Sequence, residues 1–254
     1  MQNQKTIESK VISTDKYHHQ YVEFIELAAH DLKSPLRKLE VFAEKLVKSC
    51  EQSDKESRHI YLAKVNSTLA QMKSLVEDFT SIALSSYESL EFSYVHLDEL
   101  IQKIIRELRT TTEDTSVVIQ TGDLPVIFAD EKQLAVVFRN LLENSFKFKR
   151  KDSALKINIS AERLGEGDRE RFKLSQGNYF IICISDNGIG FDDADRKRIF
   201  EPLVRLHGKS QYPGNGLGLT LVKRIVEKHN GIVFAEGSRS EGARFYIVLP
   251  ENKD

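Results

Sequence analysis

The first residue whose surroundings could support chemistry is His30, in the segment AHDLKSPLR. A solvent-facing imidazole nitrogen can attack an electrophile, and Asp31 can accept a ring N–H and raise the basicity of the other nitrogen. Ser34 lies four residues on and shares the helix face, while Pro35 cannot donate to the Asp31 carbonyl and should loosen that turn. Most exposed helical histidines do no chemistry, so the plain alternative is a surface residue.

A second candidate is a polar ridge formed by Asn140, Asn144 and Lys147, which are spaced four and three residues apart. A helix places residues at this spacing on one face. An amide oxygen is a suitable ligand for Mg²⁺, and a lysine can neutralise phosphate. Taken alone, the ridge would be a solvated helix face, and the run KFKRK that begins at Lys147 a local phosphate or helix-dipole feature.

The third candidate is the segment DNGIG, with Asp186, Gly188 and Gly190, directly after the apolar run Tyr179–Ile184. A carboxylate at the end of a buried strand can accept a hydrogen bond from an exocyclic amine such as that of adenine. The two glycines would let a ligand approach the backbone closely. The same pattern also occurs in ordinary turns.

A fourth candidate is the segment GNGLGLT, where Gly214, Gly216 and Gly218 lead into a predicted helix. Free N–H groups and the helix dipole make such a helix start an anion site. The segment is not a Walker A loop, because no Gly-Lys-Ser/Thr follows, and not a Rossmann loop, because no strand directly precedes it. The alternative is a flexible hinge.

Composition excludes several other classes of protein. The 254 residues include 37 Lys+Arg and 38 Asp+Glu, so a net charge of -1 excludes a broad nucleic-acid surface. No run approaches the roughly 20 apolar residues that span a bilayer, and the N-terminus has no signal core. Cys50 and Cys183 cannot form a disulfide framework and favour a reducing compartment. The sequence predicts a soluble, cytoplasmic chain.

The elements that must position His30 are long helices. A heptad stripe predicts a first helix over about residues 14–50, a polar turn over 51–56 and a second helix that carries apolar residues from 62 to 83. His30 falls at position f, opposite the packed seam. A hairpin with two apolar stripes cannot surround a core, so a four-helix bundle from two chains is expected. The stripe consists of Ile25, Leu32, Leu39 and Leu46.

The chain changes character near residue 92, because all 13 Gly and four of the five Pro come after it. Alternating patterns predict a mixed α/β domain, with Asp98 and Asp130 as helix N-caps, a hairpin extension over 164–178 and a left-handed stop at Asn230-Gly231. Residues 93–97 are expected to form a short connector or a strand. Further strands are expected at 117–120, 126–128, 156–161, 179–185, 232–235 and 244–249, and helices at 98–109, 134–149 and about 216–230.

In this order, the segments resemble the core of a bacterial-type sensor histidine kinase, over about residues 14–250. The His30 segment is similar to the H box, in the variant with Asp after His that is typical of phytochrome-like and hybrid kinases. The resemblance implies a dimeric helical hairpin (residues 1–92) and a two-layer α/β sandwich of the Bergerat ATP-binding fold (93–254). The N, G1, F and G2 boxes correspond to 140–147, 186–190, 199–203 and 214–219.

The resemblance also implies roles for individual residues. His30 would accept the γ-phosphoryl group of ATP, with Asp31 as general base, and Ser34 would orient water when the partner regulator is dephosphorylated. Asn144 would hold Mg²⁺. ATP itself would be contacted by Asn140, Asn144, Lys147, Asp186, Gly188, Gly190, Arg205, Gly214, Gly216 and Gly218.

Residues 191–213 would form a lid over ATP, in which Arg205 either reaches the γ-phosphate or stays a surface arginine. Two positions depart from the family pattern. Leu203 replaces a second aromatic of the F box. Ala243 replaces a threonine near adenine, and the missing hydroxyl would cost about 1 kcal/mol of nucleotide affinity.

The expected partners are a second copy of the chain and the receiver domain of a response regulator, with no nucleic acid. A sensor domain is expected upstream, and a membrane would be met only through such an upstream segment. Two rival functions stay open. One is a gyrase- or chaperone-type ATPase that uses Glu143 to activate water. The other is a pseudokinase adaptor that binds nucleotide without reacting.

Overall fold

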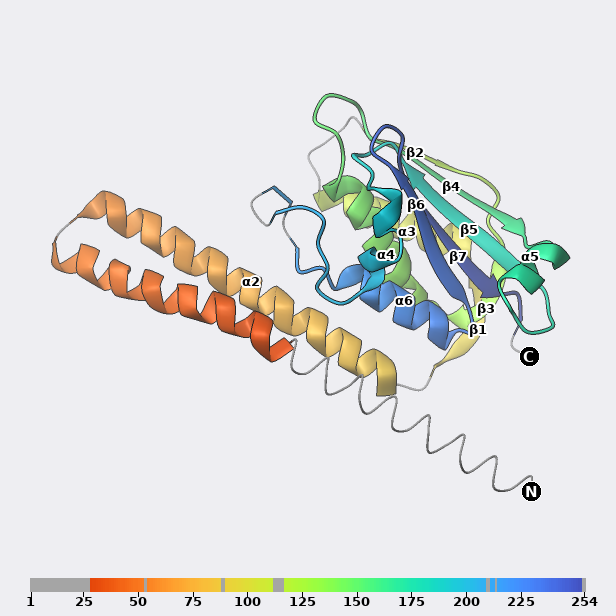
Figure 1. Cartoon of the computed structure of the whole chain (residues 1–254), viewed down its shortest axis with the longest axis horizontal. Helices are drawn as coiled ribbons and strands as arrows, with labels where there is room; N and C mark the ends of the chain where they lie inside the picture. The colour runs from red at the N-terminus through yellow and green to blue at the C-terminus, as the bar shows by residue number, and fades with distance from the viewer. Residues whose placement is uncertain are drawn as a thin grey trace, which may run out of the picture. The chain divides into compact units, whose positions relative to one another are not determined.

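The computed structural model describes residues 28–52, 54–87, 90–111, 117–208, 211–212 and 214–252, and the side chains of 84–87 and 111 are not among them. The chain divides into two compact units, Met1–Thr80 and Ser81–Asp254. Figure 1 shows the helices of the first unit, and the sheet and helices of the second. Within the described residues, no helix is both long enough and apolar enough to cross a membrane.

The first unit is a helical hairpin. One helix covers residues 28–51, and α2 runs over Lys55–Tyr87, which continues into the second unit. Residues 14–27 of the expected first helix lie outside the described residues. The turn is shorter than predicted because Asp54 caps α2, its Oδ1 accepting from the Ser57 N–H at 3.1 Å. Hydrogen bonds from Ser57 lower the pKa of the exposed Asp54 carboxyl.

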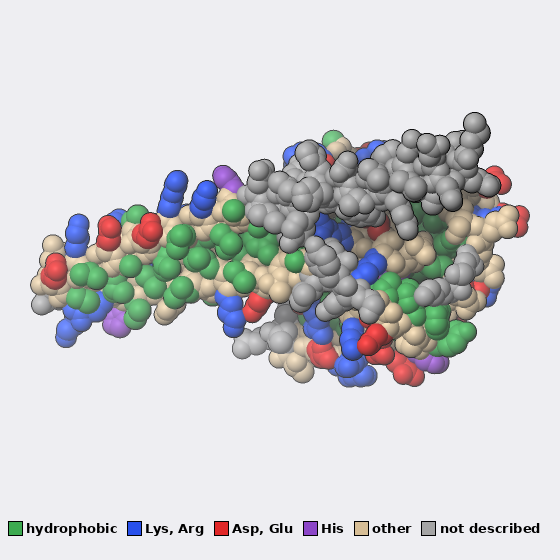
Figure 2. Space-filling model, turned by 90° about the horizontal axis from the view of Figure 1, so that it is seen from below, with side chains coloured by type: hydrophobic (Ala, Val, Ile, Leu, Met, Phe, Trp, Pro, Cys, Tyr) green, Lys and Arg blue, Asp and Glu red, His purple; other side chains and the backbone are tan. Residues whose placement is uncertain are grey.

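Lysine side chains lie over aromatic rings across the hairpin. The Lys64 ammonium lies 5.5 Å from the Phe42 ring centroid and the Lys45 ammonium 5.7 Å from that of Tyr61. Several large apolar side chains of the hairpin stay exposed, and Figure 2 shows hydrophobic side chains along this unit. They are Leu36, Val41, Val47, Ile60, Leu62, Leu69 and Val76.

The second unit alternates strands and helices, as the patterns predicted. In chain order its elements after α2 are β1 (Phe92–His96), α3 (Leu97–Thr111), β2 (Val118–Thr121), β3 (Val126–Asp130), α4 (Glu131–Lys147), β4 (Lys156–Arg163), α5 (Glu166–Arg171), β5 (Tyr179–Asp186), η1 (Asp193–Asp195), η2 (Arg198–Phe200), α6 (Gly218–Lys228), β6 (Ile232–Ser238) and β7 (Gly242–Pro250).

The main sheet has the strand order β2-β4-β5-β7-β6. Strands β2 and β4 pair in parallel, whereas the other neighbouring strands pair antiparallel. The register sets Asp186 opposite Ile157 on β4 and opposite Ala243 on β7, so the carboxylate sits where three strands meet. Strands β1 and β3 form a separate antiparallel ribbon.

Helices α3, α4 and α6 form the second layer, with α4 contacting both of the others (Figure 1). Their apolar faces and the inner face of the sheet make one core, which confirms the predicted α/β sandwich. Burying such side chains contributes about 1.5–3 kcal/mol each. The buried members on α4 and α6 are Leu134, Val137, Phe138, Leu141, Leu142, Leu221, Val222, Ile225 and Val226.

Helix ends confirm some predictions and correct others. Asp130 caps α4, accepting from the Gln133 N–H at 3.0 Å, and Asn230 adopts a left-handed φ of 58° after α6. Asp98 is not an N-cap, because α3 already begins at Leu97 and Asp98 lies in its first turn. The hairpin extension between β4 and β5 contains the short helix α5.

Candidate active site

Asp186 ends β5 in a largely closed environment and is 9% exposed. Its Oδ1 accepts from the Gly188 N–H at 2.8 Å, and its Oδ2 accepts from the Ser145 hydroxyl at 3.0 Å. Burial raises the pKa of the Asp186 carboxyl, and the hydrogen bonds from Gly188, Ser145 and the Ala243 N–H oppose this shift. The carboxylate is therefore held in one orientation by neighbouring donors.

The loop after Asp186 passes close to other backbone. A Cβ at Gly188 would come within 2.6 Å of the Phe148 carbonyl oxygen, and the Ile189 N–H donates to that same oxygen at 2.9 Å. Gly190 has a φ of 63°, and a Cβ there would overlap the backbone of the β6–β7 turn. Glycine is needed at both positions for close backbone approach.

Two members of the α4 ridge face the second glycine-rich segment. The Asn140 amide donates to the Val136 carbonyl at 2.8 Å, and its Oδ1 lies where a Cβ of Gly218 would be. The Lys147 ammonium likewise occupies the space beside Gly214. Burial, reinforced by the charge of Arg205, lowers the pKa of Lys147. The fold thus brings the ridge and the start of α6 together.

Asn144 completes the ridge and is half-buried. Its side chain makes no hydrogen bond with another described residue, so its amide oxygen is available to a ligand. Among the described residues, no group of His, Cys, Asp and Glu could hold a metal ion by itself. Asn144 suits a magnesium ion that takes its other ligands from phosphate and water.

The segment between η2 and α6 is held by hydrogen bonds between its own residues. The Arg205 guanidinium donates to the carbonyl of Tyr212 at 2.6 Å and to that of Gly214. The Leu203 N–H donates to the Gly216 carbonyl at 3.0 Å, and Leu203 has a left-handed φ of 63°. Arg205 therefore ties together parts of the segment that is expected to form the lid. Residues 209, 210 and 213 of that lid lie outside the described residues.

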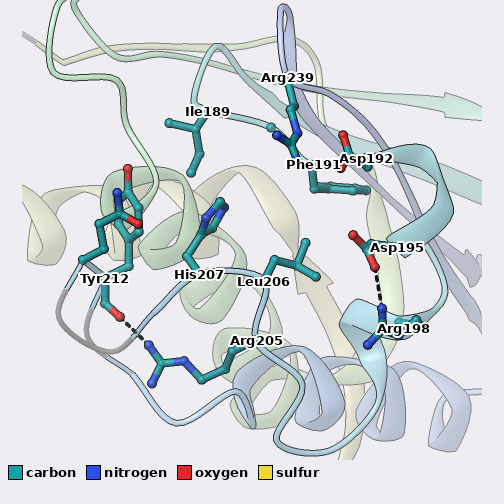
Figure 3. A pocket seen from close by; sticks show the side chains of 12 residues that line it. Ile189, Phe191, Asp192, Asp195, Arg198, Arg205, Leu206, His207, Tyr212 and Arg239 are labelled. Atoms are coloured by element: carbon teal, nitrogen blue, oxygen red, sulfur yellow. Dashed lines mark hydrogen bonds and ion pairs between the residues drawn. The ribbon is translucent and has the colours of Figure 1, made fainter.

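A cavity of about 500 Å³ lies between the Asp186 loop, the lid and the β6–β7 turn (Figure 3). Aromatic rings gather beside it, with the Phe148 and Tyr212 centroids 5.1 Å apart and those of His207 and Tyr212 5.4 Å apart. Flat rings of this kind offer stacking surfaces to a flat ligand. Arg205 lines the cavity beside Tyr212, and the charged side chains on its other side are Asp192, Asp195, Arg198 and Arg239.

His30, Asp31 and Ser34 lie in the first unit, apart in the chain from every other candidate. The His30 side chain is 82% exposed, as its heptad position predicts, and its Nδ1 lies 3.3 Å from Asp31 Oδ1. Ser34 is exposed one turn further on, and Pro35 is buried in a helix that continues through it.

Sequence reasoning missed several residues of the second unit. Ser145 was passed over between the ridge residues, although it is the α4 side chain that reaches Asp186. Tyr212 and His207 gave no local signal, and Arg150 was noted only within the basic run KFKRK, because their contacts are with distant segments. Ala243 was noted only as a departure from the family pattern. Its backbone N–H donates to Asp186, and this contact needs no side-chain hydroxyl.

Comparison with known proteins decides what this arrangement is. Residues 129–253 match the family described as histidine kinase-, DNA gyrase B- and HSP90-like ATPases. The chain is 28% identical to the phytochrome-like protein Cph1 of Synechocystis sp. over 228 residues, and 29% identical to the adaptive-response sensory kinase SasA of Synechococcus sp. over 232 residues. The chain has the core of a sensor histidine kinase.

The histidine kinase core is similar to part of each relative. The alignments cover 90% and 89% of this chain, but 29% of Cph1 and 58% of SasA. Among solved structures, the histidine kinase AdeS of Acinetobacter baumannii matches with a TM-score of 0.61 at 18% identity, covering 88% of this chain and 98% of that one. The histidine kinase ThkA, solved with its response regulator TrrA, matches with a TM-score of 0.66 at 19% identity, covering 90% and 61%.

Proposed function

We propose that this histidine kinase core uses ATP to phosphorylate His30 and passes the phosphoryl group to an aspartate of a response-regulator receiver domain. The observation that carries the proposal is the combination of an exposed His–Asp pair on a helical hairpin with an ATPase-family domain in one chain. SasA and Cph1, to which the chain is similar along nearly all its length, support this assignment.

The chemistry at His30 follows from its neighbour. Asp31 accepts the Nδ1–H of the ring, which leaves the Nε2 lone pair facing solvent as the nucleophile. A bond forms between Nε2 and the γ-phosphorus while the bond from that phosphorus to the bridging oxygen breaks, and ADP leaves with the electron pair. The phosphohistidine then donates the group to a receiver carboxylate.

The second unit supplies the nucleotide site. Asp186 would accept a hydrogen bond from the exocyclic amine of adenine, and rings near Phe148 would stack on the base. Asn140, Lys147 and the N-terminus of α6 would meet the phosphates. A Mg²⁺ ion bound to ATP would be held by Asn144 and would offset phosphate charge. The histidine kinase ShkA, solved in complex with AMPPNP, has the same fold.

Two further roles belong to the first unit. Ser34, one turn from His30, would orient water when the regulator is dephosphorylated.

The exposed apolar side chains of the hairpin would be covered by a second copy of the chain, giving a dimeric four-helix bundle. Leu69→Glu places a charge on this surface, so light scattering should show a monomer where the wild type is a dimer; an unchanged mass would exclude this interface.

The test of the kinase assignment is labelling with γ-labelled ATP and Mg²⁺. Wild-type protein should acquire acid-labile, base-stable label that His30→Gln lacks, and the label should pass to a receiver domain. His59→Gln, which changes an exposed histidine on α2, is the matched control and should label normally. Label that persists in His30→Gln would refute the role of His30.

The same experiment distinguishes the rival functions. An ATPase machine needs an acid that activates water, and Glu143 is exposed on α4 next to Asn144. Steady phosphate release without phosphoprotein would favour that role, and Glu143→Gln would then abolish the release. Absence of both phosphoprotein and phosphate release, with retained nucleotide binding, would favour a pseudokinase adaptor.

A further inference from the structure

The geometry points to Arg150 as a positioning residue that sets the Asp186 carboxylate for recognition of adenine. Arg150 follows α4 in the basic run KFKRK, which by itself suggested only a local phosphate or helix-dipole feature and no contact with the Asp186 loop. Its Nε donates to the carbonyls of Asn187 at 3.2 Å and Gly188 at 3.0 Å, and its Nη2 donates to the carbonyl of Arg239 at 2.6 Å. This inference rests on the proposed ATP-binding function.

The two carbonyls bound by Nε belong to consecutive peptide units, each of which is also held at its other end. The Asn187 carbonyl shares a planar peptide with the Gly188 N–H, which donates to Asp186 Oδ1 at 2.8 Å. The Gly188 carbonyl shares the next peptide with the Ile189 N–H, which donates to the Phe148 carbonyl at 2.9 Å. Arg150 therefore fixes the plane of the donor that orients Asp186.

The backbone freedom of Gly188 explains why the loop needs a side chain that holds its peptide groups. Gly188 has no side chain to restrict its backbone, so the peptide that donates to Asp186 would otherwise have a wide choice of orientations. The Asn187 side chain holds the neighbouring loop, accepting from the Lys156 N–H at 2.7 Å and donating to the Ala154 carbonyl at 2.9 Å. The Asn187 side chain does not bind the carbonyls of Asn187 and Gly188, which accept from Arg150.

The third bond extends the same arrangement to the β6–β7 turn. The Arg239 carbonyl accepts from Arg150, while the Arg239 guanidinium pairs with Asp192 at 2.5 Å, just after the Asp186 loop. A guanidinium spreads its N–H donors over three nitrogen atoms in a fixed planar fork, whereas an ammonium carries all of its donors on one nitrogen atom. Lysine at position 150 would keep the charge but could not hold three carbonyls on two loops.

The experiment compares the affinities of the full chain for ATP and for inosine triphosphate, which carries a carbonyl in place of the exocyclic amine. Titration calorimetry should give the wild type an ATP preference of about ten- to hundredfold, the range for a hydrogen bond to a charged group. In Arg150→Lys this preference should fall by about three- to tenfold. Arg163→Lys, at the far end of β4, is the matched control and should keep it.

Each outcome has a distinct meaning. If Arg150→Lys weakens both nucleotides by the same factor, or keeps the full preference, Arg150 does not act through Asp186 and the inference is overturned while ATP binding stands. If the wild type binds neither nucleotide or does not distinguish them, the proposed role of Asp186 fails first. A loss of preference in Arg150→Lys alone supports the inference, and because it is a ratio it does not depend on overall stability.

Discussion

Replacing His229 with glutamine should change how the stability of the ATP-binding unit depends on pH. His229 is 2% exposed at the end of α6. Its Nδ1 donates to the Ile225 carbonyl at 2.8 Å, and its Nε2 accepts from the Asp130 N–H at 3.1 Å. Because one ring nitrogen donates and the other accepts, the ring is neutral, and a second proton would face the Asp130 N–H.

Burial is the main cause that lowers the pKa of His229 below its usual range. In the unfolded chain the ring takes up a proton near pH 6.5, which the folded state resists, so the unfolded state binds more protons. The free energy of unfolding should therefore fall as pH drops below about 6.5, by at most about 1.4 kcal/mol per pH unit, and level off below the folded pKa.

The assay is urea unfolding of the full chain, followed by circular dichroism at several pH values between 7.5 and 5. At the upper pH, His229→Gln should be less stable than the wild type by about 1–3 kcal/mol, the cost of disturbing buried hydrogen bonds. This gap should shrink below about pH 6.5, because glutamine takes up no proton. His96→Gln, an exposed position on β1, is the matched control. A gap that stays constant with pH would refute the reasoning.

Three further predictions concern the Asp186 site. Asp186→Asn should raise the thermal midpoint of the protein without nucleotide, because burial raises the pKa of this carboxyl and makes its ionised form costly at neutral pH. The same change should weaken ATP binding about tenfold or more, as measured by calorimetry. Ser145→Ala removes a bond that opposes this shift, so the pH at which ATP affinity is lost should move upward; an unchanged pH profile would contradict it. Gly190→Ala should lower the thermal midpoint by several degrees in a melting scan, because a Cβ there would overlap the Ser238 backbone.

Local pattern was sufficient for the long helices of the second unit and for its strands, but not for the short helix α5. Asp130 was identified as a cap from its place before an apolar period, and the structure confirms the bond to the Gln133 N–H. Asp98 shows where the same reasoning fails, because α3 begins one residue earlier than its apparent cap. Helix ends are set by the packing of the first turn as well as by the capping residue.

Spacing along one helix also placed part of the site. Asn140 and Lys147 share a face of α4 because of the helical period, and their contacts with Gly218 and Gly214 came only from the fold. No sequence rule states which loop a ridge will meet. Ser145 illustrates the gap, since it was passed over as a residue between ridge positions.

The sequence by itself determined which residues could do chemistry, namely an exposed histidine with an acidic neighbour and a carboxylate at a strand end. The tertiary structure alone decided what holds that carboxylate: Ser145, which is 41 residues away in the chain, and Arg150, which binds the carbonyl of the residue 38 positions on. The physical reason is that strand register and loop contact depend on the whole core, because a shift of one residue would turn every side chain to the opposite face.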